Sequence, residues 1–194
     1  MFVIRKKTDN RVMRVFTHKI ADIAGGVNVA TADLTQPVLH EGTPIGKDSN
    51  GLYHVVKTAL LKANAANDAT TYTVAKGHNF KVGDIIMAKT AGKAYAITTI
   101  ATNSGNNAYD DITVGTTLGV AVSAGDVLMQ AASAGASGSA FKYAPMALVG
   151  ESYDVHSDGN LFVNAWLIAV AKEANMEAPI NDTIKNAVKG VVFI

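Results

Sequence analysis

The histidines are the side chains of this sequence best suited to acid–base or metal chemistry, and they are scattered along the chain. His18, His40, His54, His78 and His156 show no His-x-x-x-His spacing, which would place two imidazoles on one helical face. A hydrolase would need one of the last three beside a buried carboxylate. The absence of cysteine excludes disulfides, thiolate metal ligands and cysteine nucleophiles. We therefore expect a protein that is not an enzyme, with no catalytic residue, no cofactor and no metal.

Other patterns that carry chemistry are also missing from the sequence. No Gly-x-Gly-x-x-Gly or phosphate-binding loop occurs. The serines of AASAGASGSA, residues 131–140, do not form Gly-x-Ser-x-Gly, the pattern around a hydrolase nucleophile. A segment so rich in alanine, glycine and serine is instead typical of a flexible or extended connection.

The stretch LHEGTPIGKDSNGLYHVVK, residues 39–57, is polar enough to be an active-site loop, but it contains a hairpin signal. Asn50-Gly51 suits a type I′ turn, which needs positive φ at both central residues. In that register Lys47 faces His54. His40 then lies roughly 20 Å from His54 at about 3.3 Å per residue, too far to share a metal or a proton. The stretch therefore predicts two strands joined by a turn.

Two related motifs indicate an internal repeat. KVGDIIM at 81–87 and SAGDVLM at 123–129 follow the strand-like runs TYTV at 71–74 and DITV at 111–114. Glycine supplies a backbone conformation closed to other residues, and aspartate can accept a bond from a nearby N–H. Gly83-Asp84 and Gly125-Asp126 thus predict two equivalent turns at the corners of a small barrel or sandwich. A metal or acid–base site formed by the two aspartates is the alternative, and the turn context argues against it.

The first twenty residues hold six of the 17 basic side chains and one acid, Asp9. Alternation in RVMRVFTH, residues 11–18, predicts a strand, and this strand is either a solvated basic edge or a basic arm that docks on an acidic partner. Nucleic acid is the weaker partner, because no nucleic-acid-binding fold is recognisable here. The residues expected to contact a neighbouring subunit are Arg5, Lys6, Lys7, Arg11, Arg14 and Phe16.

Composition indicates a globular chain with partners. Among 194 residues, 48% are apolar but only 17% are charged, against about 25% in ordinary soluble domains. Such a chain either hides much of its surface against partners, which we favour, or has a neutral exterior. No apolar run approaches the ~20 residues that span a bilayer, and the N-terminus is not ordered like a secretory signal. We therefore expect no membrane contact.

The remaining segments predict further strands and one helix. Residues 58–70 suit a helix or two strands around an Asn-Asp turn, and their flanks favour strands. LFVNAWLIAVA, residues 161–171, is apolar on both faces and predicts one central strand, with Trp166 as a core or interface anchor. Asn181 or Asp182 is expected to cap a short helix that Gly190 ends, before a last strand at 191–194.

We expect a mainly β fold: a small barrel or sandwich of antiparallel strands and hairpins with one short C-terminal helix. Its parts are a basic N-terminal arm and irregular segment (1–38), a core with the two Gly-Asp corners (39–130), an Ala/Gly/Ser-rich connection (131–140), and strands with the helix that complete the same fold (141–194).

In their order and amino-acid sequence, these motifs resemble the head-decoration or head-fibre proteins of tailed bacteriophages, particularly those of Bacteroidetes phages and prophages. The resembling segments are LHEGTPIGKDSNGLYHVVKTA (39–59), GHNFKVGDII (77–86), AYAITTI (94–100), DITV with SAGDVLM, and EAPINDTIKNAVKGVVFI (177–194). Together they span about residues 40–194, and none of them is a catalytic motif. The first forty residues lie outside the resemblance.

The resemblance implies a structural protein on the outer surface of the virion capsid, made in the cytoplasm of the bacterial host. Its implied partners are the major capsid protein and itself, as a homotrimer that stabilises the shell. The alternative is a module on the virion that binds carbohydrate or a host-surface glycan. Exposed aromatics gathered on one face, for example Tyr53, Tyr72, Tyr95 and Tyr109, would favour that alternative.

Overall fold

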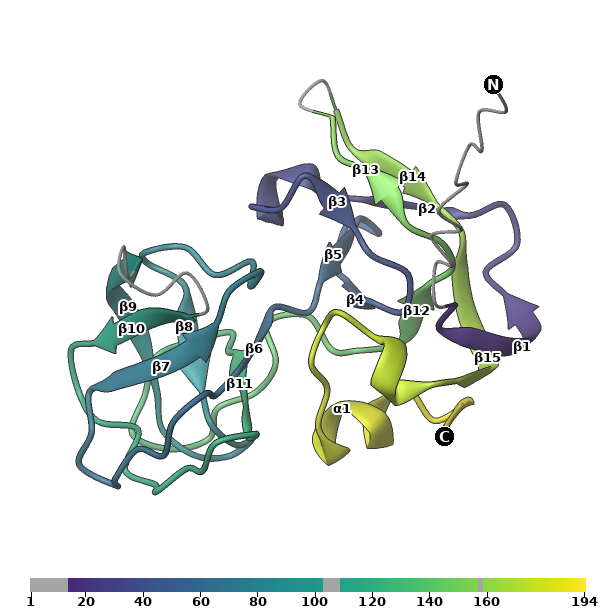
Figure 1. Ribbon diagram of the computed structural model, residues 1–194. Coiled ribbons are helices and arrows are strands. Elements are labelled where there is room, and N and C mark those ends of the chain that lie inside the picture. The colour runs from purple at the N-terminus through teal and green to yellow at the C-terminus, as the bar shows by residue number, and fades with distance from the viewer. Residues whose placement is uncertain (1–13, 103–108, 157–158) are drawn as a thin grey trace, which may run out of the picture.

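The computed structural model describes residues 14–102, 109–156 and 159–194, which form two β-rich bodies (Figure 1). We call the body built on an eight-stranded sheet the sheet body, and the body formed by residues 58–130 the barrel body. Strands dominate both, and the one α-helix of the described residues lies near the C-terminus. The predicted fold class, mainly β with antiparallel sheets and one short helix, is confirmed.

The sheet body combines segments from both ends of the chain. Its eight-stranded sheet runs in the order β1 (Phe16–Asp22), β15 (Ala165–Ala171), β12 (Ala147–Val149), β4 (Pro44–Lys47), β5 (Tyr53–Val55), β2 (Val27–Val29) and β14 (Leu161–Val163), with β16 (Val191–Phe193) also beside β15. β3 (Val38–Leu39) and β13 (Tyr153–Asp154) form a separate pair. The short helical elements are η1 (Thr31–Asp33), η2 (Glu173–Asn175) and α1 (Asp182–Ala187).

The barrel body is inserted between β5 and β12. Its six strands run in the order β6 (Thr58–Leu60), β11 (Val127–Gln130), β8 (Ile85–Met87), β9 (Ala94–Thr102), β10 (Tyr109–Val114) and β7 (Thr71–Ala75). An isolated bridge between Leu61 and Val74 brings the first and last strands together. β6 and β7 flank the Asn-Asp segment, so residues 58–70 are not helical and the preference for strands there is confirmed.

The barrel body contains one three-strand unit twice, and each unit carries one of the two Gly-Asp corners. β6, β7 and β8 correspond to β9, β10 and β11, and corresponding residues face each other at two points. Met87 pairs with Met129 between β8 and β11, and Tyr72 pairs with Ile112 between β7 and β10. Both pairs are fully buried. The two units are therefore related by an approximate twofold axis that passes through the barrel.

The two Gly-Asp corners make the same backbone hydrogen bonds. In the Gly83-Asp84 corner the glycine amide donates to the carbonyl of Ile97, and the Ile97 amide donates to the aspartate carbonyl. The Gly125-Asp126 corner makes the same two bonds with Leu61. The glycines have φ values of 93° and 96°, a region that side-chain-bearing residues rarely adopt.

The hairpin between β4 and β5 is formed as predicted, but its register differs by one residue. Gly46 faces His54 and Lys47 faces Tyr53. The turn has three residues between Asp48 and Leu52. The Asp48 amide donates to the Leu52 carbonyl across it, and only Gly51 among the turn residues has positive φ. Asp48 Oδ1 accepts from the amides at 50 and 52, which stabilises the longer turn. Such a shift of one residue in the pairing of β4 with β5 exchanges the faces on which the side chains of a strand lie.

The prediction of one doubly covered strand over residues 161–171 is wrong. The run divides at Asn164 into β14, which pairs with β2, and β15, which pairs with β1, β12 and β16. The Asn164 amide donates to the Tyr153 hydroxyl at the break. β15 is covered on one face only, since Ile168 remains 43% exposed. Trp166 is half-buried and packs against the cluster that contains Phe16.

The C-terminal helix begins as predicted and ends differently. Asn181 caps α1 by accepting from the Ile184 amide at 3.1 Å. The C-cap is Val188, and Gly190 does not have positive φ. Glycine is needed at 190 because a Cβ there would lie 2.2 Å from the carbonyl oxygen of Leu167. The last strand, β16, is paired in parallel with β15.

The Ala/Gly/Ser-rich connection is bound to the barrel body by backbone hydrogen bonds. Gly135 and Ala94 exchange two bonds of 2.9 Å, and the Ala91 amide donates to the Ser139 carbonyl at 2.7 Å. Ser139 is buried and its hydroxyl donates to the Lys89 carbonyl. The small side chains let this segment lie against the β8–β9 hairpin, so it is an attached extended segment.

Candidate functional site

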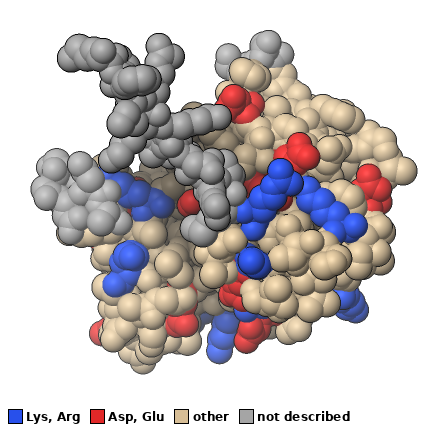
Figure 2. Space-filling view, turned by 45° about the vertical axis from the view of Figure 1, so that its right-hand side comes forward, with Lys and Arg blue, Asp and Glu red and all other residues tan. Residues whose placement is uncertain are grey.

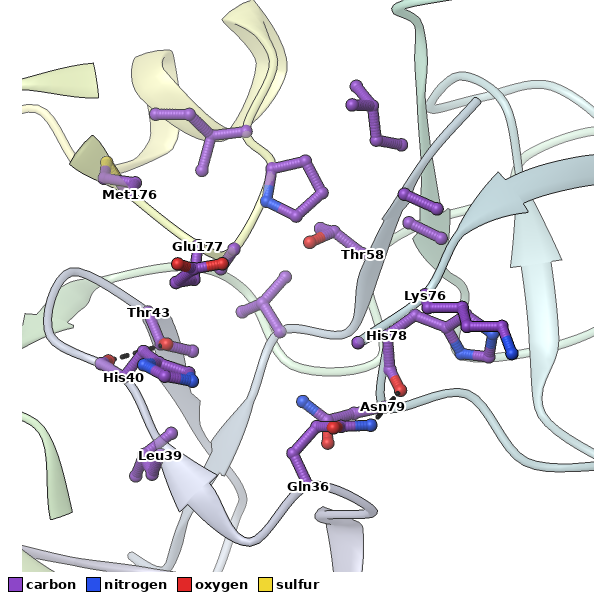
Figure 3. Close-up of a pocket in the computed structure, with 18 of the residues that line it drawn as sticks. Gln36, Leu39, His40, Thr43, Thr58, Lys76, His78, Asn79, Met176 and Glu177 are labelled. Carbon is purple, nitrogen blue, oxygen red and sulfur yellow. Dashed lines mark hydrogen bonds between the residues drawn. The ribbon is translucent and has the colours of Figure 1, made fainter. Parts of the chain in front are cut away.

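A cleft of about 450 Å³ lies between the two bodies, and the C-terminal segment closes one side of it (Figure 3). The sheet body contributes Gln36, Leu39, His40 and Thr43, and the barrel body contributes Thr58, Lys76, His78 and Asn79. Residues 173–180, which run from η2 toward α1, add a third wall that contains Met176 and Glu177. Volumes of roughly 300–1,000 Å³ are typical of ligand sites.

Hydrogen bonds tie the two bodies together along one edge of the cleft. The Thr35 amide donates to Asn79 Oδ1 at 2.9 Å, and the Thr35 hydroxyl donates to the His78 carbonyl at 2.9 Å. Gln36 Nε2 reaches the same carbonyl at 3.3 Å. Lys81 Nζ donates to the Ala32 carbonyl. The loop between β7 and β8 is therefore held against the segment around η1.

His78 contributes to this edge as a neutral residue. Its Nδ1 accepts from the Phe80 amide at 3.2 Å, and its Nε2 lies 3.5 Å from Asp110 Oδ2. Burial lowers the pKa of the imidazole, and the Asp110 carboxylate partly opposes that shift. Lys76 Nζ lies 3.7 Å from the other Asp110 oxygen. Both ring nitrogens of His78 therefore face protein groups, and neither is directed at the cleft as a base.

Two polar side chains face the cleft without a partner. Among the described residues, the His40 ring and the Glu177 carboxylate have no hydrogen-bond or ion-pair partner. Figure 3 places them on the same side of the cavity, opposite Lys76, His78 and Asn79. The rest of the lining mixes apolar side chains such as Leu39 and Ile180 with polar ones such as Thr58. The cleft can therefore accept a ligand that has an apolar body and a polar or cationic group.

The histidine with the most developed environment is His54, which lies outside the cleft. Nδ1 is hydrogen-bonded to the Asp33 carboxylate, and Nε2 lies 3.5 Å from Asp48 Oδ2. The ring stacks on Tyr143 with centroids 3.9 Å apart and planes inclined by 6°. Burial raises the pKa of the Tyr143 hydroxyl, and Asp33, Asp48 and Asp84 raise it further. Each ring nitrogen of His54 therefore faces a carboxylate of the same chain.

The sequence did not identify the His54 cluster because its members come from distant segments. Asp33 belongs to η1, Asp48 to the β4–β5 turn, and Tyr143 to the crossing from the barrel body back to β12. The predicted register also placed Lys47 opposite His54, where the structure has Gly46. A Cβ at Gly46 would lie 2.3 Å from the Ala144 carbonyl oxygen, so glycine lets the crossing segment approach β4.

The two predicted corner aspartates differ in their surroundings. Asp126 Oδ2 accepts from the Ser123 amide at 2.8 Å, and its side chain is exposed. Asp84 accepts the equivalent bond from Lys81, and it also accepts from Lys57 Nζ and Gln130 Nε2, each at 2.8 Å. Asp84 and Asp126 thus lie in separate corners, and Asp84 has an ionic partner that the motif did not reveal.

The residues expected to contact a neighbouring subunit are only partly described. Arg5, Lys6, Lys7 and Arg11 lie outside the described residues. Arg14 is exposed, and its carbonyl accepts from Asn175 Nδ2. Phe16 is buried in a cluster with Val15 and Leu148. Phe16 therefore packs in the core of its own chain.

The other residues singled out from the sequence either have structural roles or are not brought together with further candidate residues. His18 and His156 are exposed, and Tyr53 and Tyr72 are buried, so these two tyrosines do not contribute to an exposed aromatic face. Among the residues described, no group of three histidine or acidic side chains could hold a metal ion. No helix of that part of the chain is long and apolar enough to cross a membrane.

Comparisons with known proteins identify no relative of this chain. No protein-family model, no curated protein and no solved structure matches it.

Proposed function

We propose that this protein is a non-enzymatic structural protein of a bacteriophage virion, which binds the outer surface of the head and stabilises the shell through contacts between subunits. The motif resemblance supports this proposal. Three of the resembling segments, 39–59, 77–86 and 177–194, meet where the two bodies join, since each supplies residues to the cleft. The junction sets the orientation of the contact surfaces on the two bodies. A structural protein therefore needs the geometry of this junction to be fixed.

The observation that carries the proposal is an exposed apolar surface on the sheet body. Ile168 on β15 is 43% exposed, and Val192 on the adjacent β16 is 58% exposed. Ile20 lies at the register shift of β1 between Lys19, which pairs with Ala169, and Ala21, which pairs with Ile168, and it is 66% exposed. Ile194, which follows β16, is 63% exposed. We call these four residues the apolar face. Exposed apolar patches of this kind mark contact sites for other proteins.

The charge pattern fits extensive contact with other subunits. Acidic and basic side chains are interspersed with wide uncharged areas on the view in Figure 2. Interfaces that are buried permanently are depleted in charged residues at their centres. We infer that the apolar face contacts the major capsid protein or a further copy of this chain, and that the chain forms a homotrimer.

Particle occupancy tests the proposal directly. The protein should co-purify with intact phage heads, and its mass in solution should be about three times 20.2 kDa. Replacing Ile168 and Val192 by lysine should lower occupancy at least tenfold. Val82, which is 63% exposed on the barrel body, provides the matched control, so Val82→Lys should leave occupancy unchanged.

Two results would contradict the proposal. Heads that never carry the protein, although it is expressed with them, would exclude the decoration role. Specific glycan binding by the isolated protein, without any affinity for heads, would favour the host-surface module instead.

A further inference from the structure

The β4–β5 turn contains a pair of residues whose chemistry the proposed function does not use. Asn50 is the one asparagine of the sequence that is followed directly by a glycine, Gly51. Both residues are exposed. The backbone amide of Asn50 donates to Asp48 Oδ1, whereas its side-chain amide has no hydrogen-bond partner among the described residues. The described part of the chain therefore leaves the Asn50 carboxamide free to rotate.

An unrestrained asparagine carboxamide can be lost by attack from the next backbone nitrogen, which is one reason that asparagine is a thermolabile residue. That nitrogen gives its proton to solvent base and forms a bond to the asparagine Cγ. The bond between Cγ and Nδ2 breaks, and the amide nitrogen takes up a proton from water and leaves as ammonia. Water then adds to either carbonyl carbon of the cyclic imide and opens the ring, which gives aspartate or isoaspartate. Solvent water is the only co-reactant.

The environment of Gly51 favours attack by its nitrogen. The Gly51 amide donates to the Asp48 carbonyl at 3.3 Å, beyond the usual range of about 2.7–3.2 Å. A Cβ at position 51 would have no neighbour within 4 Å, so the space around the residue is open. Because glycine has no side chain and adopts many backbone conformations, it does not obstruct the approach of its nitrogen to Asn50 Cγ.

The turn is built so that either product changes it. Asp48 Oδ1 accepts from the amides of Asn50 and Leu52, each at 2.9 Å, and the Asp48 amide donates to the Leu52 carbonyl at 2.9 Å. Isoaspartate routes the backbone through its own side chain and lengthens it inside this set of bonds. Both products also place a second carboxylate close to Asp48, and like charges at short range repel.

We propose that Asn50 is a site of spontaneous deamidation, in which the Gly51 nitrogen displaces ammonia from the Asn50 side chain, and that the isoaspartate product loosens the β4–β5 turn. The change adds a negative charge beside Asp48, whose other carboxylate oxygen lies 3.5 Å from His54 Nε2. The turn and the His54 cluster are thus modified together. This inference does not depend on the proposed function, since it concerns the chemistry of one turn.

Incubation of the full-length protein at pH 8 and 37 °C, followed by peptide mapping with mass spectrometry, tests the reaction. The peptide that contains Asn50 should become about 1 Da heavier, and the formal net charge of the chain should fall from +1 to zero. Asn67 is the matched internal control, because it is also exposed and lacks a side-chain partner among the described residues, but Asp68 follows it. Asn67 should react at least about tenfold more slowly. Equal rates at the two asparagines, or an unchanged Asn50, would overturn the proposal.

Amide hydrogen exchange in the purified isoaspartate form tests the effect on the turn. The Leu52 amide, which donates to Asp48 Oδ1, should exchange at least about threefold faster than in the unmodified protein. The Ser123 amide donates to the Asp126 carboxylate in a distant corner and should exchange at the same rate in both forms. Unchanged exchange at Leu52 would show that the turn tolerates the longer backbone and would contradict the loosening.

Discussion

Lys57 and Asp84 form a buried ion pair, in which Nζ lies 2.8 Å from Oδ2 and only 3% of the lysine side chain is exposed. Lys57 lies where the chain passes from β5 into the barrel body, and its carbonyl accepts from the amide of Gln130, the last residue of β11. Asp84 also accepts from the Gln130 side chain. One corner carboxylate therefore holds together both ends of the inserted barrel.

This pair leads to a prediction about two aspartates that occupy equivalent corners. Asp84→Asn should lower the free energy of unfolding by about 3 kcal/mol, because it leaves the Lys57 charge buried without a counter-ion. Asp126→Asn should cost less than about 1 kcal/mol, because Asp126 is exposed and has no lysine partner. Urea denaturation of both variants measures the difference. Equal costs would show that the ion pair adds nothing to the corner.

The corner glycines should tolerate side chains poorly. Gly83→Ala and Gly125→Ala should each destabilise the protein by about 1–2 kcal/mol, because φ near 95° disfavours any residue with a Cβ. Gly135→Ala is the matched control: a Cβ at 135 would have its nearest neighbour at 3.5 Å, and the residue lacks a positive φ. Thermal unfolding should place the control within about 0.5 kcal/mol of the parent. A similar loss in all three variants would rule out the conformational explanation.

Packing of α1 on the barrel body should contribute strongly to stability. Ile184 is completely buried in a cluster with Met87 and Met129, the pair at the approximate twofold axis. Ile184→Ala should cost about 2–5 kcal/mol, the usual range for removing a buried isoleucine side chain. Ile168→Ala removes the same atoms from a 43% exposed position and should cost less than about 1 kcal/mol. Denaturant titration distinguishes the two, and similar values would mean that the helix is not packed as described.

Stability should fall on acidification partly because of His78. Burial lowers the pKa of His78 in the folded protein below its ordinary value near 6.5. Between the lowered and the ordinary pKa the unfolded chain binds a proton that the folded chain does not, so the free energy of unfolding decreases as pH falls through that window. The charged groups facing this ring are Asp110 and, through Asp110, Lys76.

Comparing denaturant midpoints at pH 7.5 and pH 5 tests this effect. His78→Gln should show a smaller loss on acidification than the parent protein. His156→Gln, at an exposed position, should behave like the parent. An identical pH dependence in His78→Gln and the parent would exclude His78 as a contributor.

The sequence alone determined the features that depend on a few consecutive residues. The mainly β character, the β4–β5 hairpin and the Asn181 cap follow from alternation, Asn-Gly chemistry and the preference of asparagine for an N-cap. The Gly-Asp repeat also predicted two equivalent corners. These signals are local, because positive φ, capping and strand periodicity are satisfied within about five residues.

Only the tertiary structure decided which distant groups meet. The division at Asn164 follows from the different strands that β14 and β15 pair with. The Lys57–Asp84 pair, the His54 cluster and the cleft each join segments far apart in the chain. Their formation depends on how the two bodies pack, and no short-range pattern of residue types records that packing.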